Sequence, residues 1–178
     1  MRLSSLGPLI IIPPVIGAIL VALWLAAAAI YENVRFADTS GQLLSLIATA
    51  QDMAAKDSDF DKRAGEDLLA DLRRLAQIQD NGSGPKNAWH QAIHLTAPAP
   101  SITRLETDVP APACRRLALF FGKDAHDLKL QAMEARGENG VWRRFFDGAA
   151  GSTPNYAMID AACGSTGYTT LALILALR

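Results

Sequence analysis

The chain has 178 residues, of which half are hydrophobic and a fifth are charged, and its formal net charge is -1. This length suits one domain of ordinary size, and this composition excludes a disordered tail. The near balance of charges argues against a protein whose main partner is nucleic acid, because such proteins carry a basic excess. No charged residue occurs between Arg2 and Glu32, so a purely cytosolic globule is not expected.

The first segment, residues 6–30, is almost wholly apolar. As one helix it would span roughly 38 Å at 1.5 Å per residue, against about 30 Å of hydrocarbon in a bilayer. Because Pro13 and Pro14 lack an amide donor, we expect the regular helix to start near Pro14. The residues expected to face lipid or a filament core are Val15, Ile16, Gly17, Ile19, Leu20, Leu23, Trp24, Leu25 and Ile30.

The residues that flank the apolar run predict its orientation. Arg2 and the α-amino group precede it, whereas Glu32 and Asp38 accompany Arg35 after it. The positive-inside rule therefore favours an N-terminus inside and the bulk of the chain outside. The alternative is a secretory signal cleaved near residues 26–29, but the apolar run is longer than a usual signal core and its helical pattern continues past this point.

The apolar segment is predicted to continue as an amphipathic helix over residues 32–57. One stripe at 4-3-4 spacing supports this helix: Leu43, Ile47, Ala50 and Ala54. A second, shorter amphipathic helix is predicted over residues 61–79, and it ends at the turn-forming residues 81–85. We therefore expect a long helix that is membrane-embedded at its start and amphipathic at its end.

After residue 85 the sequence changes to short runs rich in Ile, Thr, Val and Leu, separated by Pro, Gly and Asn. A short helix is predicted over residues 113–121. Strands are predicted at residues 92–96, 101–105, 128–133, 141–146 and 169–177. The last run is apolar on both faces, which predicts a central or helix-covered strand. The predicted fold class is α+β, with a long N-terminal helix packed on a C-terminal antiparallel sheet.

These elements predict two parts of the chain. Residues 1–31 form the hydrophobic segment, and residues 32–178 form a globular head. Within the head we expect the amphipathic continuation at 32–57, the second helix at 61–79 and the sheet domain at 86–178.

The chain has two cysteines, Cys114 and Cys163. An even count in a chain exported behind a membrane segment predicts a disulfide. For a loop of about 50 residues, the chain-entropy model assigns such a bond about 4 kcal/mol. The alternative, a metal or redox pair, is less favoured because CxxC spacing is absent.

The spacing of reactive residues forms no catalytic pattern. His90 and His94 are four apart but lack an acidic third ligand at motif spacing, so we expect surface histidines. Ser165 lies in GSTG rather than GxSxG, and glycine-rich phosphate loops are absent. The basic pairs at 115–116 and 143–144 could each contact a phosphate or an acidic neighbour, but solvated faces are the commoner explanation and are expected here. We therefore predict a protein that is not an enzyme and has no cofactor and no metal site.

Four stretches, taken together and in order, resemble the type IV pilins, especially the type IVb group that includes the pilins of conjugative thin pili. They are the apolar-to-amphipathic helix at 15–56, Asn87-Ala88-Trp89 before the first strand, Val109-Pro110 before the helix around Cys114, and residues 159–163 before the last strand. The family's glycine before the cleavage point and glutamate at the fifth mature position have no counterpart, since Gly7 precedes Pro8 and no acid precedes Glu32. This departure fits an unprocessed, accessory or divergent pilin-like protein.

The resemblance implies a structural subunit of a type IV pilus or pilin-like filament, with adhesion, conjugation or secretion roles. It implies storage in the bacterial inner membrane with a periplasmic head, followed by an extracellular filament. The implied partners are copies of the chain or other pilins, inner-membrane lipid before assembly, and the pilus assembly machinery. No specific nucleic acid is implied. The alternative function is a single-pass inner-membrane protein with a periplasmic sensing or scaffold domain.

Overall fold

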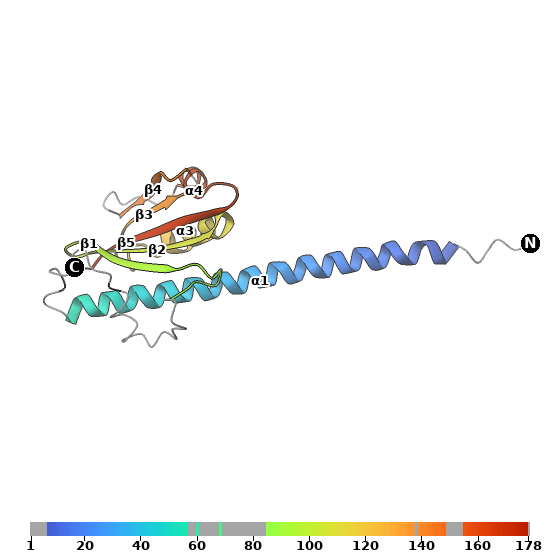
Figure 1. The fold of residues 1–178 in the computed structure, drawn as a ribbon, viewed down its shortest axis with the longest axis horizontal. Helices are drawn as coiled ribbons and strands as arrows, with labels where there is room; N and C mark the ends of the chain where they lie inside the picture. The colour runs from blue at the N-terminus through green and yellow to red at the C-terminus, as the bar shows by residue number, and fades with distance from the viewer. Residues whose placement is uncertain are drawn as a thin grey trace, which may run out of the picture. The chain divides into compact units, whose positions relative to one another are not determined.

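The structure is a computed structural model that describes residues 7–56, 60, 68, 85–137, 139–148 and 155–177. The elements, in chain order (Figure 1), are α1 (Gly7–Lys56), β1 (Ile93–Ala99), β2 (Ile102–Pro110), α3 (Ala111–Lys123), β3 (Leu130–Arg136), β4 (Trp142–Asp147), α4 (Tyr156–Cys163) and β5 (Tyr168–Ala176). The chain divides into two compact units, Met1–Ala37 and Asp38–Arg178. The division falls within α1.

The first unit contains the N-terminal part of α1. The helix begins at Gly7 and includes Pro13 and Pro14, so the predicted start near Pro14 is wrong. Pro8 in the first turn explains the earlier start, because its missing amide has no partner there and its fixed φ suits a helix. In apolar surroundings an interrupted backbone also leaves polar groups unsatisfied at several kcal/mol each, which favours a continuous helix.

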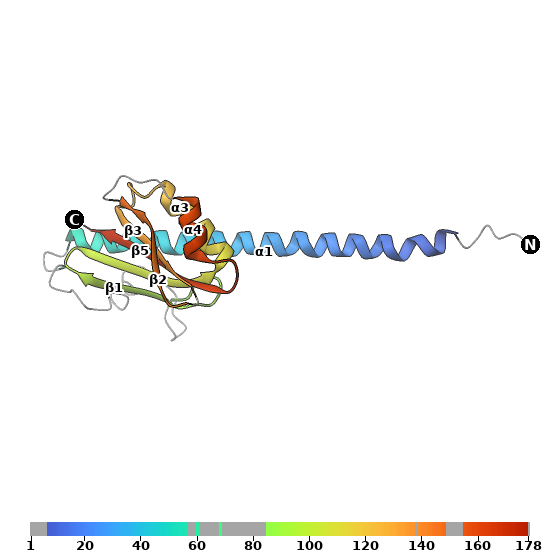
Figure 2. The same ribbon diagram turned by 90° about the horizontal axis from the view of Figure 1, so that it is seen from above.

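The second unit contains a five-stranded sheet with the strand order β1-β2-β5-β3-β4, whose strands are all labelled in Figure 1, and Figure 2 shows the same sheet from above. Every pairing is antiparallel, and β5 pairs with both β2 and β3. The last strand is therefore central, as its two apolar faces predicted. All five predicted strands are found, although β2 continues to Pro110 instead of ending at residue 105.

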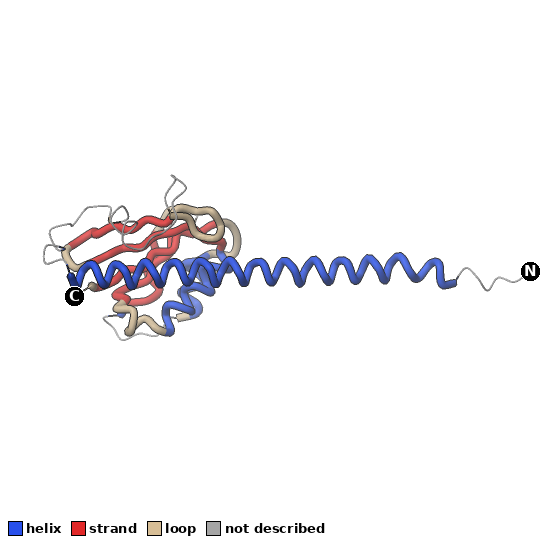
Figure 3. Tube along the Cα trace, turned by 90° about the horizontal axis from the view of Figure 1, so that it is seen from below, coloured by secondary structure: helices blue, strands red, loops and turns tan. Residues whose placement is uncertain are grey.

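Helices cover one face of this sheet, and Figure 3 shows the second-unit part of α1 lying across the strands. The predicted apolar stripe of α1 is buried throughout: Leu43, Ile47, Ala50 and Ala54. Strand residues that alternate toward the same core, such as Leu105 and Leu173, are buried and directly paired. The predicted α+β class, a long N-terminal helix packed on an antiparallel sheet, is confirmed.

The other two helices differ in how well the sequence predicted them. The predicted helix at 113–121 is α3, with wider bounds. The helix α4 was not predicted, because eight residues are too few to establish a helical period. Its local signal was Asn155, whose side-chain oxygen accepts a hydrogen bond from the Ala157 amide at 2.9 Å.

The predicted second helix at residues 61–79 falls outside the described residues, apart from Leu68. The backbone amide of Leu68 donates to the carbonyl of Leu95 in β1 at 3.1 Å. The turn predicted at 81–85 likewise lies outside the described part of the chain, except for Pro85.

Two buried threonines on β2 form a matched pair for a stability test. Thr103 is 0% exposed and its hydroxyl has no hydrogen-bond partner. Thr107 is 2% exposed and donates its hydroxyl to the Ala92 carbonyl at 3.0 Å. We expect Thr103→Val to raise the free energy of unfolding by about 1 kcal/mol, because it replaces a buried hydroxyl that makes no hydrogen bond. We expect Thr107→Val to lower it by about 2 kcal/mol, because the Ala92 carbonyl then loses its hydrogen-bond donor.

Thermal unfolding of the full chain in detergent micelles measures both changes. A loss of stability in Thr103→Val equal to that in Thr107→Val would contradict the account of the unpaired hydroxyl.

Candidate functional site

The first candidate site is the apolar surface of α1 within the first unit. The helix is long and apolar enough to cross a membrane, and its most apolar window has a mean hydropathy of 1.7 with no residue buried. Val15 and Gly17 lie in this helix, and a Cβ on Gly17 would contact nothing within 4 Å. The other residues that the sequence singled out are all more than half exposed: Ile16, Ile19, Leu20, Leu23, Trp24, Leu25 and Ile30.

Such an exposed apolar surface needs a partner. Burying a single Leu, Ile or Val side chain yields about 1.5–3 kcal/mol, so this continuous surface strongly favours an apolar environment. Lipid chains and the helices of other protein molecules both provide one.

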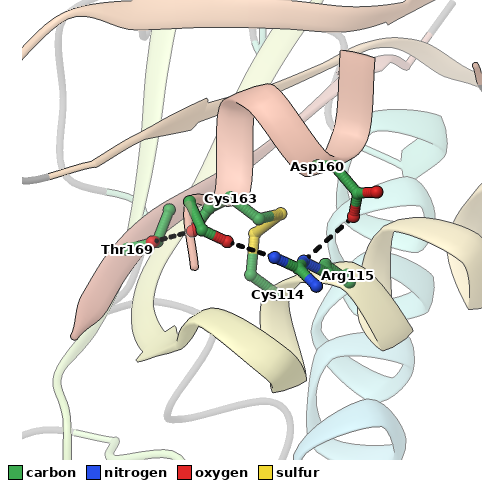
Figure 4. The surroundings of a disulfide bond; sticks show 6 residues. Cys114, Arg115, Asp160, Cys163 and Thr169 are labelled. Carbon is green, nitrogen blue, oxygen red and sulfur yellow. Dashed lines mark hydrogen bonds and ion pairs between the residues drawn. A yellow bond between two sulfur atoms is a disulfide. The ribbon is translucent and has the colours of Figure 1, made fainter. Parts of the chain in front are cut away.

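The second candidate site is the predicted disulfide, which is present between Cys114 and Cys163 (Figure 4). The two Cα atoms are 5.7 Å apart across a sequence separation of 49, and both residues are fully buried. Cys114 lies on the buried face of α3, and Cys163 is the last residue of α4. The bond therefore joins the two helices and closes a loop that contains β3 and β4.

Polar contacts from α3 and β5 surround the disulfide at the C-terminus of α4. The Arg115 Nη2 group donates to the Gly164 carbonyl at 2.6 Å, and its Nε lies 3.0 Å from the Asp160 carboxylate (Figure 4). The Thr169 hydroxyl donates to the Cys163 carbonyl at 2.7 Å. These donors satisfy carbonyls that a helix end leaves unpaired, and the cation suits the negative end of the helix dipole.

The prediction of solvated faces for the two basic pairs holds for Arg116, Arg143 and Arg144, which are exposed, whereas Arg115 is half-buried. Contacts within the protein nevertheless engage three of these arginines. Arg115 is engaged as described, and Arg143 donates to the Ala161 carbonyl at 3.4 Å. Arg144 donates twice to Glu134. Sequence spacing could not reveal these hydrogen bonds, because their acceptors lie between 10 and 49 residues from the arginines that donate.

The third candidate site is the turn before β1, which is organised by the buried side chain of Asn87. The amide nitrogen donates to the Thr107 hydroxyl at 2.9 Å and to the Asp108 carbonyl at 2.7 Å. The amide oxygen accepts from the backbone of Trp89 at 2.9 Å and of Gln91 at 3.1 Å. This one side chain thus connects the turn to β2 and uses all of its donors.

The same turn is tied to α1, because the Ala88 amide donates to the Thr39 hydroxyl at 3.1 Å. The next residue of the turn, Trp89, is buried. Asn87-Ala88-Trp89, which carried part of the resemblance, therefore fixes where the amphipathic part of α1 meets the first strand.

Replacing Asn87 with aspartate should test this turn. We expect Asn87→Asp to lower the free energy of unfolding by about 2 kcal/mol, because the two donors are lost and a carboxylate oxygen then faces the Asp108 carbonyl. The matched control is Asn139→Asp, whose Oδ1 accepts from the Val141 amide at 3.2 Å and would still do so. Chemical denaturation of the full chain in micelles gives both values, and equal losses would contradict the proposed role of Asn87.

The face of the sheet opposite the buried core carries a charged network that the sequence did not predict. Glu134 on β3 contacts Arg104 on β2 at 3.0 Å and Arg144 on β4 at 2.9 Å. Arg104 also pairs with Glu106, and its guanidinium lies 4.2 Å from the centre of the Trp142 ring. Although the network faces outward, the side chains of Glu134 and Arg104 are only 12% and 19% exposed.

Removing the shared carboxylate should destabilise this network. We expect Glu134→Gln to lower the free energy of unfolding by about 2 kcal/mol, because the largely buried Arg104 guanidinium loses its anion, while the exposed Arg144 adds little to this loss. Asp147→Asn is the control, since Asp147 is 45% exposed and its carboxylate lies 3.7 Å from Arg144. There we expect a loss below about 0.5 kcal/mol. Equal losses in thermal unfolding would show that Glu134 does not organise the network.

An open cavity of about 230 Å³ lies beside the disulfide. Arg143 and Ser165 contribute polar groups to its wall, and Val141 contributes an apolar side chain. Its full lining is Gly137, Asn139, Val141, Arg143, Ala161, Ala162, Cys163, Gly164, Ser165, Thr166 and Thr169. The cavity is large enough for a small polar ligand. Among the described residues of its lining, no two form a pair suited to general acid–base catalysis.

The two histidines considered as metal ligands are both exposed. His90 lies in the turn before β1, and His94 lies on β1 itself. Among the described residues, no three His, Cys, Asp or Glu side chains gather as a metal site.

Comparisons with known proteins add little to this geometry. No protein-family model matches the sequence, and no curated protein matches it. Among solved structures, TcpA, a type IV pilin from Vibrio cholerae El Tor biotype, is similar at a TM-score of 0.49 and 12% sequence identity. The match covers 79% of this chain and 98% of that chain. At this TM-score we draw no functional conclusion from the likeness.

Proposed function

We propose that this chain is a structural subunit of a type IV pilus or pilin-like filament of the type IVb group. The observation that carries the proposal is the continuous exposed apolar surface of α1 from Ile16 to Ile30, on a helix that continues into a folded α+β head. In this proposal residues 1–31 are the membrane and filament-core segment, and residues 32–178 are the head.

The exposed apolar surface of α1 is covered in both the membrane and the filament. In the inner membrane, lipid chains cover it while the head stands in the periplasm. In the filament, the same surface packs against copies of the chain or other pilins, so leaving lipid does not expose it to water. Gly17 and the alanines at 26–29 allow close approach between helices, as small residues do in membrane bundles.

The head suits an oxidising compartment. A buried disulfide is stable outside the cytosol, and it protects a domain that stands in the periplasm and then outside the cell. The assembly machinery of the pilus moves the subunit between these places, and the outward surface of the head serves adhesion, conjugation or secretion. No nucleic acid, cofactor or metal is part of this function.

Shearing filaments from the cell surface tests the proposal directly. We expect the polypeptide in the sheared filament fraction, identified by intact mass, which also reports whether the N-terminus is trimmed. A strain without the assembly ATPase is the control, and there the chain should remain in the inner membrane. Finding the chain only in the inner membrane of assembly-competent cells would contradict the proposal.

The alternative is a single-pass inner-membrane protein whose periplasmic domain senses a ligand or acts as a scaffold. The cavity beside Cys163 favours this alternative, because a filament subunit has no need of a ligand pocket. It would leave the chain in the inner membrane, and Arg143→Ala would then abolish its signalling or scaffolding output without affecting any filament.

A further inference from the structure

Three polar side chains form a compact cluster where the apolar surface of α1 ends. The Arg35 Nη2 group donates to the Tyr31 hydroxyl at 2.9 Å, and Nη1 lies 3.3 Å from the Glu32 carboxylate. The guanidinium carbon lies 4.1 Å from the centre of the Tyr31 ring. All three residues belong to the first unit of the chain.

The Arg35 side chain points toward the N-terminus of α1. Side chains on a helix lean toward its N-terminus, and here both partners of Arg35 lie three and four residues earlier. The guanidinium is therefore held about one turn, roughly 5 Å, before its own Cα. In a helix with its N-terminus inside, this direction leads back toward the membrane, the reverse of a snorkelling arginine.

We infer that Tyr31, Glu32 and Arg35 form a headgroup-binding anchor that sets the depth of α1 in the bilayer, with Arg35 contacting the phosphate of an outer-leaflet phospholipid. The inference rests on the proposed membrane-stored form of the subunit. A guanidinium has five N–H donors in a fixed fork, so each terminal nitrogen has a second N–H besides the one that bonds Tyr31 or Glu32. The Arg35 side chain is 24% exposed, so a phosphate would reach it at this exposed part. A phosphate can accept two such donors at once.

The apolar length alone does not determine the depth. From Gly7 to Ile30 the helix extends about 36 Å, roughly one turn more than the about 30 Å of hydrocarbon it must cross. Such a helix can shift or tilt at small cost. A tyrosine ring at headgroup level, with an arginine held beside it, restricts how far the helix can shift along the membrane normal. Glu32 compensates the charge of Arg35, so the cluster is neutral when the helix later enters a protein environment.

The test measures the depth of Trp24 in the full chain, reconstituted in vesicles of phosphatidylglycerol and phosphatidylethanolamine that carry bromine at graded acyl positions. Trp24 lies in the apolar helix, whereas Trp89 and Trp142 lie in the head and give a constant background. We expect Arg35→Gln to move the quenching maximum by about one helical turn, roughly 5 Å. Arg35→Lys should give a smaller shift, because the charge remains but the fork and ring stacking are lost.

The matched control is Asp38→Asn, an exposed charged position one turn later, which should leave the quenching profile unchanged. In vesicles of a phosphate-free galactolipid, the native chain should show the profile of Arg35→Gln. Identical profiles for the native chain and Arg35→Gln in phospholipid would overturn the anchor. An absence of Trp24 quenching at every depth would instead overturn the membrane-stored subunit itself, so the two failures are distinguishable.

Discussion

Replacing Cys114 and Cys163 together with alanine is expected to lower the free energy of unfolding of the head by about 4 kcal/mol. The disulfide closes a loop across a sequence separation of 49, and its removal lets the unfolded chain regain the entropy of that loop. Since both cysteines are fully buried, alanine avoids the added cost of a buried serine hydroxyl. For a head of this size, the expected fall in Tm is on the order of 10 °C.

The measurement is thermal unfolding of the full chain in detergent micelles, with and without a reductant. Reduction of the native chain should reproduce the loss seen in the double variant. The control is Arg115→Met, which removes the contacts to Asp160 and Gly164 but keeps the disulfide. Because that ion pair is partly exposed, it should cost about 1 kcal/mol or less. A double variant as stable as the native chain would show that the disulfide does not stabilise the head.

The second large effect is expected from a charge placed in the apolar surface of α1. Leu20 is exposed near the middle of the apolar segment. Arginine at such a position raises the free energy of membrane insertion by about 3–4 kcal/mol relative to leucine. This change corresponds to a loss of roughly a few hundredfold in the inserted population. Helix packing in a filament core should fail for the same reason, because an unpaired cation would be buried there.

Fractionation of cells that produce Leu20→Arg measures the effect as the ratio of membrane-bound to soluble chain. The matched control is Leu119→Arg, the same substitution at a partly exposed leucine of α3 in the head. That control should insert and assemble normally. Equal membrane retention of the two variants would contradict the assignment of α1 as the membrane and filament-core helix.

The elements that depend on local pattern were predictable. Leu43, Ile47, Ala50 and Ala54 share a helix face whatever covers them, so their spacing alone identified the buried side of α1. The last strand was apolar on both faces, and only a central strand is buried on both. Two cysteines behind an apolar segment allowed one intramolecular pairing, and that disulfide is present. In each case the physical cause lies within a few residues or in a simple count.

The remaining contacts were decided by tertiary structure. Glu134 on β3 can bind Arg104 on β2 only because β5 alone separates the two strands in the sheet. This strand order brings the two charged groups to 3.0 Å. Arg115 meets the end of α4 only once the disulfide and the sheet have set the two helices together. Asn87 could be recognised as part of a turn, but the two hydrogen bonds that its amide nitrogen donates depend on β2. Sequence alone therefore determined which surfaces are apolar and where the long helix, α3 and the five strands lie, because these follow from local periodicity, whereas the eight residues of α4 are too few to show a period. The partners of the polar groups were decided by strand order and register, which bring distant residues within hydrogen-bonding distance.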